Sequence, residues 1–191
     1  VLHRLAGKAL VQHVIDTARD LKARHTIVIT GHGADQVEPA LTQANAADNL
    51  QFARQMPQLG TGHAVQQAVP LLPDDGVVVV LSGDVPLTQA DTLQTLIDTC
   101  AGKQLALLTI DFADPTGYGR IVRSPSGQVH AIVEHKDANE QQRAIREVYS
   151  GIMAVPAKLL KPWLARLDNN NAQQEFYLTD VVKFAEADGV P

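Results

Sequence analysis

The 191-residue sequence predicts an α/β fold in which strands and helices alternate along the chain. Over the first 110 residues, apolar positions switch repeatedly between helical spacing and short β-branched runs. This pattern is typical of layered sheets with right-handed crossovers. Hydrophobic residues make up 45% of the chain and charged residues 19%, a balance that provides a sizeable core and excludes a disordered chain.

Each expected element follows from its local pattern. Residues 10–21 have apolar positions at helical spacing, and residues 26–30 form a β-branched run that stops at Gly31. The next elements expected are a helix over 34–42, a strand over 50–55, a glycine-rich turn and helix over 60–72, a helix over 88–100 and a strand over 105–110. The run over 76–81 is continuously apolar, so we expect a strand buried on both faces of a parallel sheet.

After Asp111 the pattern changes. Residues 121–122 and 129–133 are expected to form a hairpin around the turn residues 124–127. An apolar run over 148–155 and helices near 157–167 and 178–187 follow, with 169–171 expected as only a short polar link. The chain is therefore one domain, 1–191, with a first part over 1–110 and a second over 111–191.

Composition excludes several classes of protein. The 16 Lys and Arg against 21 Asp and Glu give a net charge of −5 without a basic cluster, and the eight aromatic residues are scattered. We therefore expect no nucleic-acid partner. A single cysteine, Cys100, excludes an internal disulfide framework, and its place in a helical pattern suggests a core residue. The apolar runs are too short for a membrane span and no signal-peptide pattern is present, so we expect a cytoplasmic protein.

The first candidate site is the glycine-rich turn over 55–64. Gly60 and Gly62 at a helix entrance would let backbone N–H groups approach a ligand closely, and the positive end of the helix favours anions or carbonyl oxygens. The alternative is a plain turn in which Thr61 is the N-cap of the helix.

The second candidate follows the apolar run over 76–81. Asp84 would enter the crevice at the carboxyl end of a strand, beside Gly83, which has no side chain. Mg²⁺ is commonly held by one or two carboxylates together with substrate phosphates. The alternative is a turn aspartate ahead of Pro86, or one that starts the next helix.

The third candidate is spread over 114–120, 133–136 and 175–180. Glu134, at the end of an apolar strand, could accept hydrogen bonds from sugar hydroxyls, and Gly119 could offer its backbone to the same ligand. Each could instead be a turn or surface residue. Zinc-ligand spacing, a serine nucleophile elbow and a Walker-type loop are all missing from the sequence.

A series of motifs makes the sequence specific when it is taken in order. They are LAGK at 5–8, VQHVI at 11–15, QLGTGHA at 58–64, GDVPL at 83–87, DPTGYGR at 114–120, IVEHKDA at 132–138 and NNNAQ at 169–173. Across essentially the whole chain, the series closely resembles the N-terminal uridylyltransferase domain of the bacterial bifunctional N-acetylglucosamine-1-phosphate uridylyltransferase / glucosamine-1-phosphate acetyltransferase family. The resemblance implies a Rossmann-like nucleotidyltransferase fold of the GT-A type. Its sheet would be mixed and mostly parallel, flanked by helices, with a nucleotide-binding part over 1–110 and a small β-hairpin sugar-binding part over 111–191.

The resemblance also implies a reaction. The family joins UTP and N-acetylglucosamine 1-phosphate into UDP-N-acetylglucosamine and pyrophosphate with Mg²⁺, a step of cell-wall precursor synthesis. Asp84 is the implied Mg²⁺ ligand and the catalytic residue. The implied substrate contacts are Gln55, Gly60 and Thr61 to uracil, Ser82 and Gly83 along the nucleotide, and Gly119, Glu134, Tyr149, Tyr177 and Thr179 around the amino sugar.

The sequence departs from the family in ways that set further expectations. The family's glycine-rich phosphate loop would precede Val1, and its second Mg²⁺ ligand and trimer-forming acetyltransferase domain would follow Pro191, so we expect the 191 residues alone to be inactive and the full-length protein to be a homotrimer. Ser82 replaces a common tyrosine, and Tyr149 replaces the family's asparagine. Two other functions stay open: a non-catalytic nucleotide-sugar-binding or assembly module, and a nucleotidyltransferase for another sugar phosphate.

Overall fold

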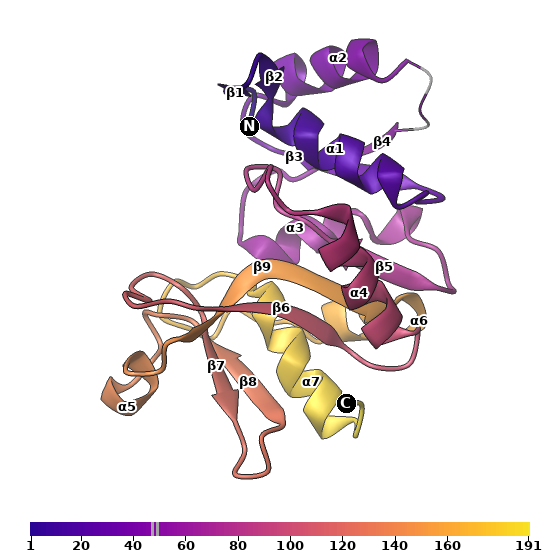
Figure 1. Cartoon of the computed structure of the whole chain (residues 1–191). Helices are drawn as coiled ribbons and strands as arrows, with labels where there is room; N and C mark the ends of the chain where they lie inside the picture. The colour runs from indigo at the N-terminus through magenta and orange to yellow at the C-terminus, as the bar shows by residue number, and fades with distance from the viewer. Residues whose placement is uncertain (47, 49) are drawn as a thin grey trace.

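The computed structural model describes residues 1–46, 48 and 50–191. The N-terminal part is a parallel pair of strands with two helices packed against it (Figure 1). β3 (Thr26–Thr30) pairs with β4 (Leu50–Arg54), with Thr26 opposite Leu50. α1 (Leu10–Asp20) and α2 (Ala34–Ala44) cover this pair, and a two-stranded turn, β1 (Arg4–Leu5) with β2 (Lys8–Ala9), leads into α1.

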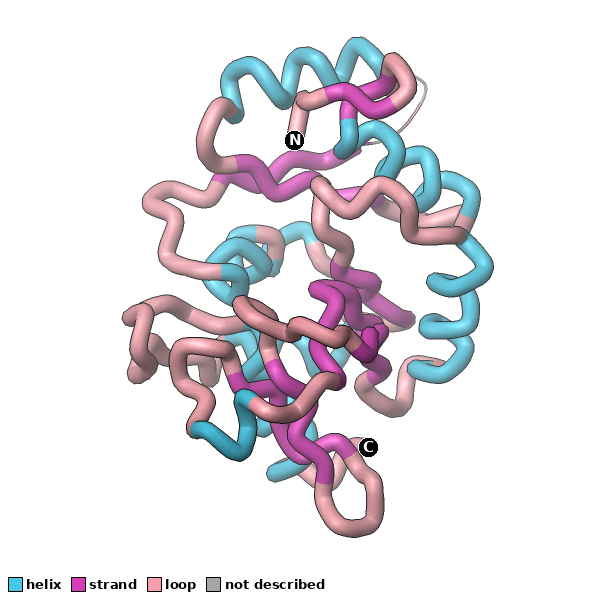
Figure 2. The backbone as a smooth tube through the Cα atoms, turned by 60° about the vertical axis from the view of Figure 1, so that its left-hand side comes forward, coloured by secondary structure: helices cyan, strands magenta, loops and turns pink. Residues whose placement is uncertain are grey.

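The rest of the molecule is built on a five-stranded antiparallel sheet, and β9 (Glu147–Pro156) is the centre of this sheet. β6 (Ala106–Asp111) runs along one edge of β9. The other edge is shared by β5 (Val77–Val80), which pairs with β9 up to Met153, and by β7 (Arg120–Arg123), which pairs with it at Val148. β8 (Val129–Val133) completes a hairpin with β7, at the opposite end of the molecule from the β3–β4 pair (Figure 2).

The expected α/β class, the mixed strands with flanking helices and the hairpin are confirmed, but the sheet is not mostly parallel. In the described part of the chain, β3–β4 is the only parallel ladder between strands. The valines of β5 are each half-buried, not buried on both faces as the sequence suggests. The reason is that β5 pairs only with β9 among the described strands, and therefore lies at a sheet edge.

The core has two layers, one on each face of β9. Met153 and Val155 face α6 (Ala157–Leu164) and α7 (Val181–Ala187), where the fully buried Trp163 lies. The alternate residues, Ile152 and Ala154, face α4 (Ala90–Cys100). Cys100 is fully buried in this second layer, as expected for a core cysteine, and burial raises the pKa of its thiol.

The remaining helices are short. α3 (Thr61–Gln67) continues into a 3₁₀ turn (Val69–Leu71), and another 3₁₀ turn (Leu178–Asp180) precedes α7. α5 (Glu140–Arg143) has no counterpart among the predicted helices, because it is too short to show a period; a capping box between Asn139 and Gln142 begins it. No helix in the described ranges is both long and apolar enough to span a bilayer.

A bulge interrupts β9 where its shared edge passes from β5 to β7. Thr109 of β6 lies opposite Tyr149 whereas Leu107 lies opposite Met153, so two steps along β6 correspond to four along β9. Gly151, inside the bulge, has a φ of +88°, and a Cβ there would lie 3.0 Å from the Oγ of Ser82. Bulges commonly re-aim side chains beside functional sites. This bulge brings the segment after β5 next to the segment that carries Tyr149.

Candidate functional site

The glycine-rich turn before α3 is docked onto the segment 175–178. The Gly62 N–H donates to the carbonyl of Phe176 at 2.7 Å, and the Phe176 N–H donates to the carbonyl of Leu59 at 2.8 Å. Gly60 has a φ of +112°, and a Cβ at this position would lie 2.7 Å from the Phe176 carbonyl oxygen. The two glycines therefore let two stretches of backbone approach each other.

This docking changes two expectations from the sequence. The Gly62 amide, expected to approach a ligand, is already bonded to Phe176. The alternative, in which Thr61 is the N-cap, is also wrong in that detail, because Gly60 is the N-cap residue and Thr61 is the first residue of α3. The Thr61 hydroxyl accepts a hydrogen bond from the Leu178 N–H at 3.0 Å, so it holds the segment that leads to Thr179.

Gln55 lies at the base of the same turn and is buried, with 7% of its surface exposed. Its side-chain amide donates to the carbonyl of Gly60 at 2.9 Å and lies 3.1 Å from Nδ1 of His63. The structure thus brings Gln55, Gly60 and Thr61 together, as expected. In this arrangement the amide nitrogen of Gln55 stabilises the turn itself.

Leu81 follows β5, and Ser82, Gly83 and Asp84 come next and form the Ser82 loop. The Asp84 carboxylate is exposed, and no ion pair or side-chain hydrogen bond within the described residues involves it. A Cβ on Gly83 would make only ordinary contacts, 3.5 Å from Val11 and 3.7 Å from Val1. No group of three or more His, Cys, Asp or Glu side chains suited to a metal occurs in the described ranges. An exposed, unpartnered carboxylate fits a hard cation that takes its other ligands from phosphates and water.

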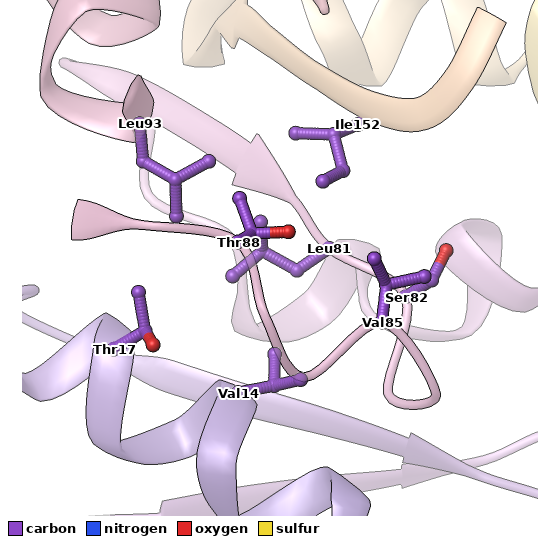
Figure 3. A pocket seen from close by; sticks show the side chains of 8 residues that line it. All are labelled: Val14, Thr17, Leu81, Ser82, Val85, Thr88, Leu93 and Ile152. Atoms are coloured by element: carbon purple, nitrogen blue, oxygen red, sulfur yellow. The ribbon is translucent and has the colours of Figure 1, made fainter. Parts of the chain in front are cut away.

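A small cavity lies beneath this loop, between α1, α4 and β9 (Figure 3). Its volume is about 10 Å³ and its lining is largely apolar, including Val14, Leu81, Leu93 and Ile152. A cavity of this size holds at most one water molecule. It is therefore a packing gap below the Ser82 loop and not a substrate site.

Glu134 and Thr179 form the polar centre of the second part. The Thr179 hydroxyl donates to Oε1 of Glu134 at 3.0 Å, and Thr179 is only 4% exposed. A Cβ on Gly119 would lie 3.5 Å from both carboxylate oxygens of Glu134 and 2.8 Å from Ile132, so only glycine leaves this space beside the carboxylate. Burial raises the pKa of Glu134, and the negative charges of Asp137, Asp180 and Glu175 add to the rise, against the hydrogen bond from Thr179.

Tyr149 reaches the same centre from β9. Its N–H donates to the carbonyl of Gly119 at 2.9 Å. Its hydroxyl is buried and has no hydrogen-bond partner within the described chain. Burial raises the pKa of this hydroxyl, and the charge of Glu134 contributes. The structure thus gathers Gly119, Glu134, Tyr149 and Thr179 in one place.

Tyr177 lies beside this group, but its hydroxyl is already engaged. It accepts from the Gln173 amide at 2.9 Å and donates to Asp137 at 3.2 Å. Burial is the main reason that its pKa is raised. Asp137 and Gln173 are therefore site residues that the sequence analysis missed. The motifs IVEHKDA and NNNAQ contain them and are the signal that could have found them.

The segment 169–173 is more than the short polar link expected. The Oδ1 of Asn171 accepts from the N–H groups of Gln173 and Glu175, both at 3.2 Å, and its amide donates to the Glu175 carbonyl at 2.6 Å. Asp137 also accepts from the N–H of Ala172 at 2.9 Å. These bonds fix the turn that leads to Tyr177 and Thr179.

The sequence is similar to known proteins over its whole length. Residues 1–149 match the family model of the MobA-like NTP transferase domain. The whole chain is 66% identical over 196 residues to a protein named Bifunctional protein GlmU from Polaromonas naphthalenivorans, and 69% identical over 194 residues to one of the same name from Albidiferax ferrireducens. The chain spans about 41% and 42% of the length of these relatives. The resemblance to one part of a bifunctional bacterial protein is thereby confirmed.

Solved structures show the same fold at low sequence identity. A crystal structure of UDP-glucose pyrophosphorylase complexed with UDP-glucose has a TM-score of 0.74 and 16% identity, covering 98% of this chain and 78% of that one. A structure of HddC from Yersinia pseudotuberculosis complexed with GMP-PN has a TM-score of 0.63, also at 16% identity, covering 93% and 72%. Because the family model of the MobA-like NTP transferase domain matches residues 1–149, the chain belongs to that family.

Proposed function

We propose that the chain is the uridylyltransferase part of a bifunctional enzyme and that it joins UTP and N-acetylglucosamine 1-phosphate into UDP-N-acetylglucosamine and pyrophosphate. One observation carries the proposal. The β9 bulge places the Ser82 loop, which leads to Asp84, beside the strand that carries Tyr149 to Glu134 and Gly119. A nucleotide phosphate and a sugar phosphate bound to these two parts would meet above the bulge.

In this proposal, Gln55, Gly60 and Thr61 form the uracil site, and Ser82 and Gly83 line the nucleotide within residues 1–110. Asp84 would hold Mg²⁺, which neutralises negative charge on phosphate oxygens when bound. The second part, residues 111–191, binds the sugar. Because Thr179 occupies Oε1 of Glu134, the other carboxylate oxygen remains for a sugar hydroxyl.

The chemistry needs no protein nucleophile. The sugar phosphate is already an anion, so the chain has only to hold it in line with the α-phosphate and to exclude water. Glu134 and Thr179 would fix the sugar ring, and Gly119 would leave room for it. Preorganised groups of this kind act mainly through positioning and electrostatics.

Binding measurements test the proposal. Glu134→Gln removes the charge but keeps an acceptor for Thr179. We expect it to lower the affinity for N-acetylglucosamine 1-phosphate about 10-fold or more, as for loss of a charged hydrogen bond of about 1.5–3 kcal/mol. The affinity for UTP should not change. Glu140→Gln on the exposed face of α5 is the matched control. Calorimetric titration with both ligands is the assay. Equal affinities of all three proteins for the sugar phosphate would refute a sugar site at Glu134.

One observation favours a second candidate, a nucleotidyltransferase for another sugar phosphate. The buried Tyr149 hydroxyl, which has no partner among the described residues, stands where the family has asparagine. If N-acetylglucosamine 1-phosphate is the substrate, Tyr149→Asn should raise its affinity about 5- to 100-fold. The reason is that a buried sugar hydroxyl without a hydrogen-bond partner costs about 1–3 kcal/mol, and the asparagine amide would supply that partner. A loss of affinity on this substitution would favour the other sugar.

A further inference from the structure

Arg120 is one of the most buried side chains in the molecule, with 1% of its surface exposed. Buried arginines are normally paired with a carboxylate, but no ion pair within the described residues includes Arg120. Its guanidinium donates instead to the carbonyl of Tyr118, to Nδ1 of His135 at 3.2 Å and to the carbonyl of Arg143 at 3.5 Å. Its Nε has no partner in the described chain. This charged group therefore serves to join three segments.

Those segments lie on the face of β7 opposite to the proposed sugar site. Side chains alternate between the two faces of a strand. A Cβ on Gly119 would meet Glu134 and Ile132, and Ile121 packs with Ile132 and Val182 of α7. Positions 119 and 121 therefore face the site. Arg120, between them, faces the other side, toward α5. His135 directly follows Glu134, as Arg120 directly follows Gly119. The Arg120–His135 contact thus ties together the backbone of the two residues that frame the sugar.

We propose that Arg120 is a positioning residue of this site, and that it holds Gly119 against Glu134 only while His135 is neutral. The inference rests on the proposed function for its link to sugar binding. Arg120 touches no ligand itself. Its effect passes through the Gly119 turn, whose carbonyl accepts from Tyr149, and through the backbone between His135 and Glu134.

The dependence on His135 follows from donor and acceptor chemistry. A guanidinium only donates, so Nδ1 of His135 must be the unprotonated acceptor. Histidine is the side chain that gains its charge between about pH 8 and 5. A second proton would replace this bond by two positive groups facing each other. Asp114 is the nearby acid; hydrogen bonds from Thr116, with smaller contributions from Arg120 and His135, hold its pKa below its usual range. Asp114 stays ionised and offsets part of the repulsion without restoring the bond, and Arg143 contributes only its carbonyl.

Two substitutions separate this role from simple stability. His135→Asn places an amide oxygen near the position of Nδ1 and keeps an acceptor that does not titrate. Arg120→Lys keeps the charge but cannot bridge three acceptors in a plane. His130→Asn is the matched control, since His130 lies at the far end of β8 and pairs with Glu186.

Calorimetric titrations of N-acetylglucosamine 1-phosphate at about pH 8 and about pH 5.5 provide the functional readout. We expect the wild type and His130→Asn to lose about 5- to 20-fold more affinity on acidification than His135→Asn does, as for one charge-assisted hydrogen bond. At the higher pH, Arg120→Lys should lower the affinity for the sugar phosphate by a similar factor and leave the affinity for UTP unchanged. If Arg120→Lys does not fold, the His135 comparison decides. An equal loss of affinity in His135→Asn and wild type overturns the inference.

A second readout needs no ligand and keeps this inference separate from the proposed function. The Tyr149 amide, bonded to Gly119, should exchange with solvent about fivefold faster, after correction for intrinsic rates, when His135 becomes protonated. The Ala157 amide, bonded to Gly76 at the other end of β9, is the internal reference. Faster exchange in the wild type but not in His135→Asn supports the Arg120 role, whatever the binding result. If the wild type also binds no sugar phosphate, that second result overturns only the proposed function. Unchanged exchange in the wild type overturns the Arg120 role whatever the binding shows.

Discussion

Substituting Gly60 by alanine tests the docking of the glycine-rich turn onto the segment that carries Thr179. The added Cβ would lie 2.7 Å from the carbonyl oxygen of Phe176, 2.9 Å from Cβ of Glu175 and 3.0 Å from the N of Phe176, and two of these three contacts are backbone atoms. The backbone at Gly60, with φ +112° and ψ 175°, is in a region that is essentially restricted to glycine. Both effects oppose any side chain.

The magnitude follows from these two contributions. Backbone strain of this kind costs about 1–3 kcal/mol and overpacking about another 1–3 kcal/mol. Gly33→Ala is the matched control, because Gly33 also has a positive φ, +73°, but has no atom within 4 Å of an added Cβ. A left-handed conformation alone costs about 1–2 kcal/mol.

The assay is thermal unfolding followed by sugar-phosphate titration. At about 2–4 °C per kcal/mol for a chain of this size, we expect Gly60→Ala to lower Tm by about 5–20 °C and Gly33→Ala by about 2–8 °C. Gly60→Ala should also lower the affinity for N-acetylglucosamine 1-phosphate, because the segment 175–178 that it displaces leads to Thr179. Equal Tm shifts for the two variants would refute the steric reasoning, and an unchanged sugar affinity in Gly60→Ala would refute the link to Thr179.

Three further predictions concern single side chains. On the proposed function, Asp84→Asn in a chain extended at both ends should lower pyrophosphate release by about 100-fold or more. It should change the free energy of unfolding by less than about 1 kcal/mol, since the side chain is exposed; normal turnover would remove Asp84 from the proposed mechanism. The pKa of Glu134 is raised in the folded protein, so its ionisation destabilises the fold as pH rises through that pKa; the Tm of Glu134→Gln relative to wild type should therefore be higher at pH 7 than at pH 4, and a constant difference would contradict this. Tyr149→Phe should be neutral or stabilising by up to about 1 kcal/mol in chemical unfolding, because it removes a buried hydroxyl without a partner; a loss of 2 kcal/mol or more would reveal a missed hydrogen bond.

The sequence predicted best what local patterns determine. The helical spacing over 10–21 and 88–100 corresponds to α1 and α4, and the turn residues over 124–127 join β7 to β8 as expected. The pairing of β5 could not be found in the same way. Its valines are equally suited to a parallel or an antiparallel neighbour, and the partner, β9, lies far along the chain. Burial of a strand depends on its neighbours, and composition does not encode them.

The site shows the same division. The structure brings Gly119, Glu134 and Thr179 into one group, as expected from the sequence. What it could not predict is which polar atoms the protein uses itself. The Gly62 amide and the Tyr177 hydroxyl have partners on distant segments that dock against them, and the Gln55 amide is bonded to Gly60 of its own turn. A glycine that admits a ligand and one that admits a neighbouring backbone look the same in a sequence.

The position of β9 also determines the order in which the molecule can assemble. Among the described strands, β5 and β6 are hydrogen-bonded only to β9, which is the last strand in the chain. During synthesis, four strands of the larger sheet leave the ribosome before the strand that joins them. The β1–β2 turn, the β3–β4 pair and the β7–β8 hairpin each have their partner close enough in sequence to form early. Until residues 147–156 emerge, the apolar edges of β5 and β6 stay unpaired, and this interval is when the nascent chain is most exposed to aggregation.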